Sequence, residues 1–341
     1  VPDAFCLVNP KLPGEAYPDP QITGVGVAFK LACALLSKKS LVVKRLAKHQ
    51  REHVENWEKW LLDLVAIGTV ADCHSLLGEN RILVHYGLLV LRKTRWLGLR
   101  ELLRLAGADL ENLNTHTLGF LLAPRINAAG RLEHASIALR TLLSEDLSEA
   151  QGLAARLEEI NTRRQESTKR LISEAREQAA LYNQDSVLVL SSDQWHKGVV
   201  GIAAGRLAED FGKPSIVLAE EGEKLTGSVR TYGEFNVIEA LQSCAEYLEK
   251  FGGHKQAAGL TLSRENLDYF RVGLNKYAQE HQADPVSNPL LELDTLLDPK
   301  DISLDLYDLI GELEPFGMEN EKPKFLLSGI RLSGLKRVGG Q

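Results

Sequence analysis

The stretch Gly227-Ser228-Val229-Arg230 closes a predicted strand over residues 224–230. Serine hydroxyls and arginine guanidiniums both donate hydrogen bonds to phosphate, and glycine lets backbone N–H groups approach a ligand. Because side chains alternate along a strand, Ser228 and Arg230 are expected on one side of it and Val229 on the other. The stretch therefore predicts a phosphate-binding site at the end of a strand.

A second glycine-rich segment, Gly252-Gly253-His254-Lys255-Gln256-Ala257-Ala258-Gly259, follows after one helix length. Gly252 and Gly253 would bring backbone donors to a neighbouring phosphate, and His254 would add an imidazole. The alternative is a helix C-cap followed by a surface histidine. Together, the two segments predict a phosphate-binding half-site.

The residues around these segments alternate between strand and helix patterns. The predicted elements are strands at 186–190, 215–218, 224–230 and 257–262, and helices at 199–211, 237–251 and 264–279. Before them, residues 147–182 contain no proline and one glycine, Gly152, and carry an intermittent apolar stripe. This pattern predicts an α/β domain preceded by one long helix.

The remaining segments are predicted to be mostly helical on the N-terminal side. The predictions there are a strand end at 7–10, helices at 24–36, 57–67, 81–92 and 99–105, a turn at 68–74, and a segment at 115–122 that leads into residues 124–132. A polar, proline-bearing linker at 282–289 precedes two strands, 290–293 and 325–335, which flank a helix near Tyr307.

The composition is that of an ordinary globular protein of two or three domains, with 341 residues and a formal net charge of −6. No apolar run is long enough to cross a bilayer and no signal peptide opens the chain, so we expect a cytoplasmic protein without a membrane partner. The four cysteines are scattered and are expected to be reduced. The negative charge argues against an all-over basic surface, so a nucleic-acid site would be a local groove.

Two basic stretches could supply such a groove, although most runs of this kind are solvated helix faces. The first contains Lys38, Lys39, Lys44, Arg45, Lys48 and Arg51. The second contains Arg156, Arg163, Arg164, Lys169, Arg170 and Arg176, interleaved with glutamates on the long helix. The glutamates suit ordinary pairing along a helix surface.

Two further blocks complete the pattern, Trp195-His196-Lys197-Gly198-Val199-Val200-Gly201 and Pro124-Arg125-Ile126-Asn127-Ala128-Ala129-Gly130-Arg131-Leu132. In this order the four blocks resemble the DHH phosphoesterase superfamily, and within it the RecJ-type single-stranded-DNA-specific exonucleases. The resemblance extends from Ala4 to Asn320. No Asp-His-His triplet is present, so we expect a C-terminal part of such a nuclease that is inactive by itself.

The resemblance implies an α/β fold of two lobes joined by a long helix and followed by the start of an oligonucleotide-binding (OB) β-barrel. The implied divisions are the C-terminal part of a DHH catalytic domain (1–146), a connecting helix (147–182), a DHH-associated phosphate-binding domain (183–281) and a partial OB-like domain (288–341).

The implied function is metal-dependent hydrolysis of single-stranded DNA from the 5′ end, releasing mononucleotides in DNA repair and recombination. The implied cofactors are two Mn²⁺ or Mg²⁺ ions, held mostly by residues outside this chain. The implied partners are single-stranded DNA, a single-strand-binding protein and a helicase, and the chain is expected to be a monomer. Two alternatives are a phosphodiesterase for short oligonucleotides or cyclic dinucleotides, and a non-catalytic DHH-like replication scaffold.

The first candidate for chemistry outside the phosphate site is Asp72, which ends the apolar run Gly68-Thr69-Val70-Ala71. A carboxylate there can bind a hard divalent cation, and the alternative is a helix N-cap or turn residue. The resemblance favours a catalytic metal ligand.

Arg125, Asn127 and Arg131 share one block, and their spacing lets a turn or helix start aim two guanidiniums and an amide at one substrate. The alternatives are salt bridges to the long helix for the two arginines and a turn role for Asn127. His196 precedes a predicted helix, where a histidine is a candidate phosphate ligand or only a cap or packing residue.

Overall fold

The computed structural model describes residues 4–38, 40–46, 56–281, 291–331, 333, 334 and 336. These residues fall into two compact units. Among the described residues, the helical unit contains those within 4–124, 141–154 and 291–336, and the sheet unit contains those within 125–140 and 155–281. Lys39, Lys48, Arg51 and the predicted linker at 282–289 lie outside the described residues.

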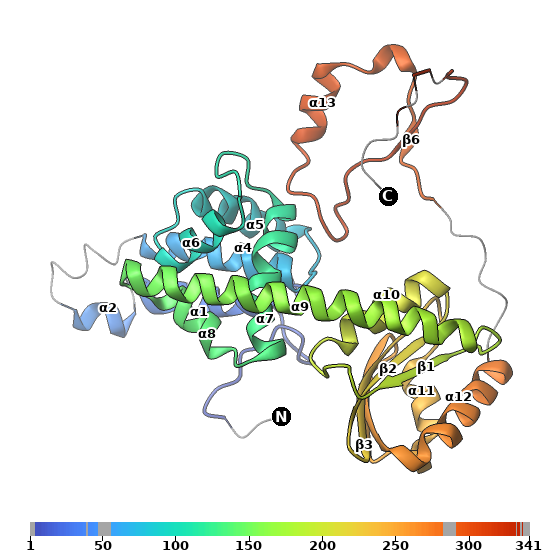
Figure 1. Ribbon diagram of the computed structural model, residues 1–341. Coiled ribbons are helices and arrows are strands. Elements are labelled where there is room, and N and C mark those ends of the chain that lie inside the picture. Colours follow the sequence, from blue (N-terminus) through green and yellow to red (C-terminus); the bar gives the residue numbers. More distant parts are fainter. Residues whose placement is uncertain are drawn as a thin grey trace. The chain divides into compact units, whose positions relative to one another are not determined.

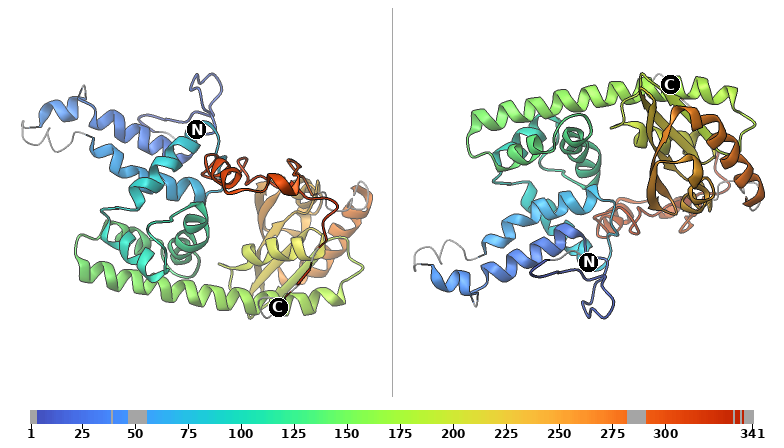
Figure 2. Two further views of the ribbon diagram at one scale, coloured as in Figure 1. Left: turned by 90° about the horizontal axis from the view of Figure 1, so that it is seen from above. Right: turned by 90° about the horizontal axis from the view of Figure 1, so that it is seen from below.

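The long helix predicted at 147–182 is confirmed as α9 (Leu147–Leu181), which starts in the helical unit and continues into the sheet unit. Figure 2 shows it as one unbroken helix. No helix within the described ranges is long and apolar enough to cross a membrane.

The helical unit is built on α4 and α5, which pack closely. An ideal Cβ on Gly87 of α5 would lie 2.3 Å from the Leu62 carbonyl oxygen of α4, so only glycine permits this approach. Asp63 of α4 is fully buried and accepts hydrogen bonds from Thr94 Oγ1 (2.6 Å) and Trp96 Nε1 (3.3 Å). The elements of this unit are α1 (Gly24–Leu36), α2 (Leu41–Arg45), η1 (Trp57–Leu61), α4 (Leu62–Ala71), α5 (Gly78–Leu91), α6 (Leu97–Leu105), η2 (Thr117–Leu122), β6 (Thr295–Leu296), η5 (Pro299–Asp301), α13 (Leu304–Gly311) and β7 (Phe325–Leu326).

Several predictions for this unit are confirmed and others are wrong. Helix 24–36 and the helix near Tyr307 are confirmed. The strand end at 7–10 is wrong, because within the described residues no strand pairs with it. The turn at 68–74 is also wrong in its first half, since α4 continues to Ala71. Gly68 allows this continuation by close packing, with an ideal Cβ position only 2.8 Å from Val25 Cγ1.

The two strands predicted near the C-terminus are shorter or displaced. The first lies at Thr295–Leu296 instead of 290–293, and the second ends at Leu326, with residues 327–331 outside any strand. Residues 332, 335 and 337–341 lie outside the described part of the chain.

The sheet unit contains a five-stranded sheet of order β1-β2-β3-β5-β4, in which β1 and β2 are parallel and the other neighbours antiparallel (Figure 1). Its elements are α7 (Ala123–Leu132), α8 (Ser136–Leu143, which ends in the helical unit), the second part of α9, β1 (Leu188–Ser192), α10 (Val200–Phe211), β2 (Ser215–Glu221), β3 (Lys224–Arg230), α11 (Val237–Ser243), η3 (Ala245–Tyr247), β4 (Lys250–His254), β5 (Ala257–Ser263), η4 (Arg264–Asn266) and α12 (Leu267–His281).

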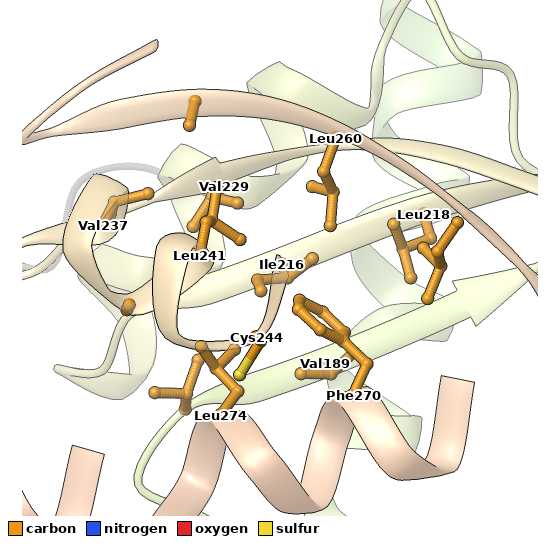
Figure 3. Close-up of a cluster of buried hydrophobic side chains, with 14 of the residues drawn as sticks. Val189, Ile216, Leu218, Val229, Val237, Leu241, Cys244, Leu260, Phe270 and Leu274 are labelled. Atoms are coloured by element: carbon orange, nitrogen blue, oxygen red, sulfur yellow. The ribbon is translucent and has the colours of Figure 1, made fainter. Parts of the chain in front are cut away.

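Each face of the sheet buries an apolar cluster. One face packs against α9 and α10, in a cluster that includes Val217, Leu207 and Ala175. The other packs against α11 and α12, in a cluster that includes Ile216, Phe270 and Leu274 (Figure 3). This three-layer arrangement confirms the predicted α/β class for this region.

Two predictions for the sheet unit are wrong, each for a tertiary reason. The helix predicted at 237–251 ends at Ser243, because residues 250–254 form the edge strand β4 against β5. The strand predicted at 186–190 begins at Leu188, because Asn275 Oδ1 accepts from the N–H groups of Ser186 (2.7 Å) and Val187 (3.0 Å). A side chain of α12 thus takes the place of a strand neighbour there.

Candidate phosphate-binding site

The face of the sheet that packs against α10 carries the predicted phosphate ligands. Ser228 of β3 lies opposite Gly259 of β5, which lies opposite Gly252 of β4. In the next row, Arg230 lies opposite Ala257, and Ala257 opposite His254. Directly opposed residues share a face of an antiparallel sheet, so Ser228, Arg230 and His254 project to one side.

The surface of the sheet is open at Gly252 and Gly259. An ideal Cβ on Gly252 would have no atom within 4 Å, and one on Gly259 would have only Gly227 O, at 3.8 Å. The helix C-cap expected as the alternative is therefore replaced by a strand whose backbone is accessible to a ligand.

Gly253 differs from Gly252, because it points to the opposite face of the sheet. An ideal Cβ there would lie 2.3 Å from the Ala257 carbonyl oxygen. The close approach of β5 accounts for glycine at 253 without a ligand. His254 is exposed at the end of β4.

Helix α10 approaches Ser228 and Arg230 through a glycine. An ideal Cβ on Gly201 would lie 3.1 Å from Ser228 Oγ and 3.3 Å from Arg230 Nη2. Both groups therefore lie directly beneath the Gly201 position of α10, which carries no side chain. This leaves Ser228 and Arg230 in a half-buried site beside bare helix backbone.

The Arg230 guanidinium is hydrogen-bonded to the backbone and has no carboxylate partner among the described residues. Its Nη1 donates to the Val229 carbonyl at 2.8 Å, and no described carboxylate forms an ion pair with it. Burial lowers the pKa of Arg230, and the charge of Arg131 lowers it further. The guanidinium stays protonated, so it presents a partly desolvated positive charge that an anion can neutralise.

Arg131 reaches this region from the end of α7. Its carbonyl oxygen would lie 1.9 Å from an ideal Cβ on Gly198, so the end of α7 touches the turn that leads into α10. The Arg131 side chain is exposed, and Asn127 lies one turn earlier on the same exposed face of α7. The structure thus brings Arg131 together with Arg230, and Asn127 lies on the side of α7 that carries Arg131.

Arg125 lies elsewhere on α7 and is paired. Its Nε and Nη2 both donate to the Glu158 carboxylate of α9, the latter at 3.1 Å. Such a fork matches a carboxylate as well as a phosphate. This is the salt bridge to the long helix that the sequence left open as an alternative, and a phosphate contact for Arg125 stays a prediction.

His196 belongs to the turn that precedes α10. Its exposed ring accepts a hydrogen bond from Gly198 N at Nδ1 (3.0 Å). A neutral ring in this state carries its proton on Nε2 and can donate from there. The turn role of His196 is therefore visible, and a phosphate role stays a prediction.

Asp72 lies in the helical unit as the C-cap of α4. Its side chain is 72% exposed, and Oδ2 lies 3.3 Å from His74 Nε2. Among the described residues, no group of three or more His, Cys, Asp or Glu is placed to hold a metal. Asp72 can supply one oxygen ligand, but the residues present do not fit a two-metal centre.

The sequence did not distinguish Arg164 from the other arginines of the long helix. In the structure Arg164 is half-buried on α9. Burial lowers its pKa, and the charge of Arg131 lowers it further. The spacing of Arg164 among the interleaved glutamates does not indicate that its side chain is half-buried.

Comparisons with known proteins identify two domain families in this chain. The family described as "DHHA1 domain" matches residues 184–280, and the family described as "RecJ OB domain" matches residues 293–341. The single-stranded-DNA-specific exonuclease RecJ of Bacillus subtilis is 39% identical over 99% of the chain. The chain is thus similar to RecJ proteins over almost its whole length.

Proteins from a second organism are similar over a comparable share of the chain. RecJ of Thermus thermophilus is 35% identical over 96% of the chain. A crystal structure of the Thermus thermophilus RecJ in complex with Mn²⁺ superimposes with a TM-score of 0.77 at 34% identity, covering 92% of this chain and 44% of the other. A second structure of that protein contains Mg²⁺ and has a TM-score of 0.74, covering 89% of this chain and 45% of the other.

The chain spans about half the length of the curated RecJ proteins that it matches. It covers 41% of the Bacillus subtilis protein and 45% of the Thermus thermophilus protein. The metals in the crystal structures show divalent-metal binding by those relatives, whose sequences extend well beyond the matched part.

Proposed function

We propose that this chain provides the end-recognition part of a single-stranded-DNA-specific 5′-to-3′ exonuclease, with Ser228 and Arg230 binding the terminal 5′ phosphate. The observation that carries the proposal is the position of Arg230, which is half-buried beside Ser228 and beneath Gly201 and forms no ion pair with a described carboxylate. The names of the RecJ relatives support DNA as the substrate.

The geometry explains why such a site would favour a strand end. A terminal phosphate carries about −1.5 to −2 charges at neutral pH, whereas an internucleotide phosphate carries one. Arg230, with Arg131 nearby, therefore prefers the end of a strand to its middle. Holding that end at a constant distance from the reacting bond would release products of constant length, which agrees with mononucleotide release.

The match to an OB domain favours strands over very short oligonucleotides or cyclic dinucleotides, because OB folds bind several nucleotides at once. Asp72 is proposed as one ligand of a two-metal site whose other ligands come from the part of the family's sequence that this chain does not span. We accordingly expect no nuclease activity from the chain alone. Steady release of mononucleotides from single-stranded DNA with Mn²⁺, abolished by Asp72→Ala, would contradict this.

Because DNA is the proposed substrate, we propose a role in DNA repair and recombination. The proposed location of the protein is the cytoplasm. A single-strand-binding protein and a helicase are proposed partners, because they hold and produce single strands, and the chain is proposed to be a monomer. Light scattering and co-purification with either partner test these points.

The test of the phosphate site is Arg230→Ala, measured with 5′-phosphorylated and 5′-hydroxyl oligonucleotides. A charge-assisted hydrogen bond contributes about 1.5–3 kcal/mol, so affinity for the phosphorylated strand should fall about tenfold to a hundredfold. The 5′-hydroxyl strand should lose much less. Equal losses for both strands, together with a lowered melting temperature, would show that Arg230 only supports the fold.

A further inference from the structure

A basic groove of about 450 Å³ lies between α9 and α10 of the sheet unit, on residues that the proposed function does not use. Four of the side chains that line it are positively charged, namely Arg164, Lys169 and Arg176 of α9 and Arg206 of α10. None of the described residues that line it is acidic. The groove therefore suits an anionic ligand.

Carboxylates outside the groove neutralise only part of this charge. Asp210 of α10 pairs with both Arg176 and Arg206. Within the described part of the chain, Arg164 and Lys169 form no ion pair with a carboxylate. Two positive charges of the groove are therefore unbalanced, in a chain whose formal net charge is −6.

Arg164 has features that a solvated helix-surface arginine lacks. Its Nη2 donates to Asn161 Oδ1 at 2.9 Å, but its Nε is buried and has no hydrogen-bond partner among the described residues. Burial lowers the pKa of the guanidinium, which nevertheless stays protonated. Partly desolvating a charge and leaving a buried N–H without an acceptor are both costly. An anion bound in the groove would offset this cost by supplying the missing counter-charge.

The length of the groove indicates the form of its ligand. Arg164 and Arg176 are twelve residues apart on α9, which corresponds to about 18 Å along the helix axis. Arg164 and Lys169 are separated by about 7.5 Å along the same axis. An extended peptide places side chains on one face about every 6.7 Å, so alternate acidic residues match this spacing. Gln165 and Ser173 also line the groove and can form hydrogen bonds with a peptide backbone.

A single DNA strand matches the groove less well. A strand carries one charge about every 3.4 Å, which is roughly half the axial separation of Arg164 and Lys169. Proteins that bind single strands also stack the bases on aromatic side chains, and no aromatic residue is among the described residues that line this groove. Charge spacing and lining therefore favour an acidic peptide.

We propose that the groove between α9 and α10 binds an extended acidic segment of a partner protein, in which aspartate or glutamate alternates with small polar residues. Successive carboxylates of the segment pair with Arg164 and Lys169, and Arg206 adds positive charge from the α10 side. The proposal is independent of the proposed function, because it uses neither Ser228 nor Arg230.

The test measures binding of a labelled peptide of about seven residues, in which glutamate alternates with serine, to the 341-residue chain by fluorescence anisotropy. Glutamine in place of glutamate should weaken binding about tenfold or more. Lys169→Glu reverses an exposed charge of the groove and should weaken binding of the glutamate peptide about tenfold. Arg170→Glu is the matched control, because it reverses a charge one residue away, outside the groove lining, and should change the affinity little.

Arg164→Gln should also weaken the glutamate peptide about tenfold, with thermal melting to show that the variant is folded. The proposal is overturned if the unmodified protein does not bind the glutamate peptide, or binds the glutamine peptide equally well. It is also overturned if Lys169→Glu and folded Arg164→Gln bind the glutamate peptide as Arg170→Glu does. A 5′-hydroxyl oligothymidine is measured in parallel. A larger loss for this strand than for the peptide in Lys169→Glu would assign the groove to DNA instead.

Discussion

Gly201→Ala should weaken phosphate binding without unfolding the protein. The new Cβ would lie 3.1 Å from Ser228 Oγ and 3.3 Å from Arg230 Nη2, so both groups must move by a few tenths of an ångström. Loss of one charge-assisted hydrogen bond to the ligand corresponds to about 1.5–3 kcal/mol, or a tenfold to hundredfold weaker affinity. Replacing glycine inside α10 meanwhile favours the helix by up to about 1 kcal/mol.

Gly205→Ala is the matched control for this prediction. Gly205 lies one turn further along α10, and an ideal Cβ there would be 3.9 Å from Arg230 Cγ, an ordinary contact. It should gain the same helix preference without displacing Ser228 or Arg230. Fluorescence anisotropy with 5′-phosphorylated and 5′-hydroxyl oligonucleotides, alongside thermal melting, measures both effects. The reasoning is refuted if Gly201→Ala binds the phosphorylated strand as tightly as Gly205→Ala does.

Four further substitutions distinguish residues that support the fold from residues that bind the ligand. Gly198→Ala would place a Cβ 1.9 Å from the Arg131 carbonyl oxygen and should lower the free energy of unfolding by about 1–3 kcal/mol. An unchanged denaturant midpoint of unfolding would contradict this contact. Arg125→Ala and Glu158→Ala should lower the melting temperature similarly, and a loss of phosphate affinity in Arg125→Ala alone would show instead that Arg125 binds phosphate. Burial raises the folded-state pKa of Asp63 above its unfolded value, so the folded chain binds this proton more tightly than the unfolded chain does. The free energy of unfolding should therefore fall as pH rises from about 4 through the folded-state pKa. Asp63→Asn should remove that dependence, and parallel unfolding curves for both proteins across this pH range would refute it.

The placement of the candidate site follows from the change in character across one face of the sheet. Over β1 and β2 this face is apolar and covered by α9 and α10, as at Leu190 and Val217. In the same row it becomes Ser228, Gly259 and Gly252 over β3, β5 and β4. The small and polar residues over β3, β5 and β4 leave backbone and hydroxyl groups accessible to a ligand, beside the edge of the layer formed by α9 and α10.

The sequence by itself determined the elements that depend on local patterns. Strand Lys224–Arg230, with Ser228 and Arg230 on one side, agrees with its prediction because alternation along a strand needs no distant residue. Helix Gly24–Leu36 agrees as well, since Thr23 caps it locally by accepting from Gly26 N at 3.0 Å. The motif order likewise predicted the similarity to RecJ proteins, which the comparisons confirm.

Only the tertiary structure decided which residues share the site. Strand β4 exists because it pairs with β5, and this pairing overrode the helical pattern of residues 237–251 and brought His254 to the face of Arg230. The environment of Arg164 depends on α7, which lies more than 30 residues earlier in the chain, and local spacing on α9 cannot encode it. Pairing and burial between distant segments have no local sequence period, so they emerge only when the chain has folded.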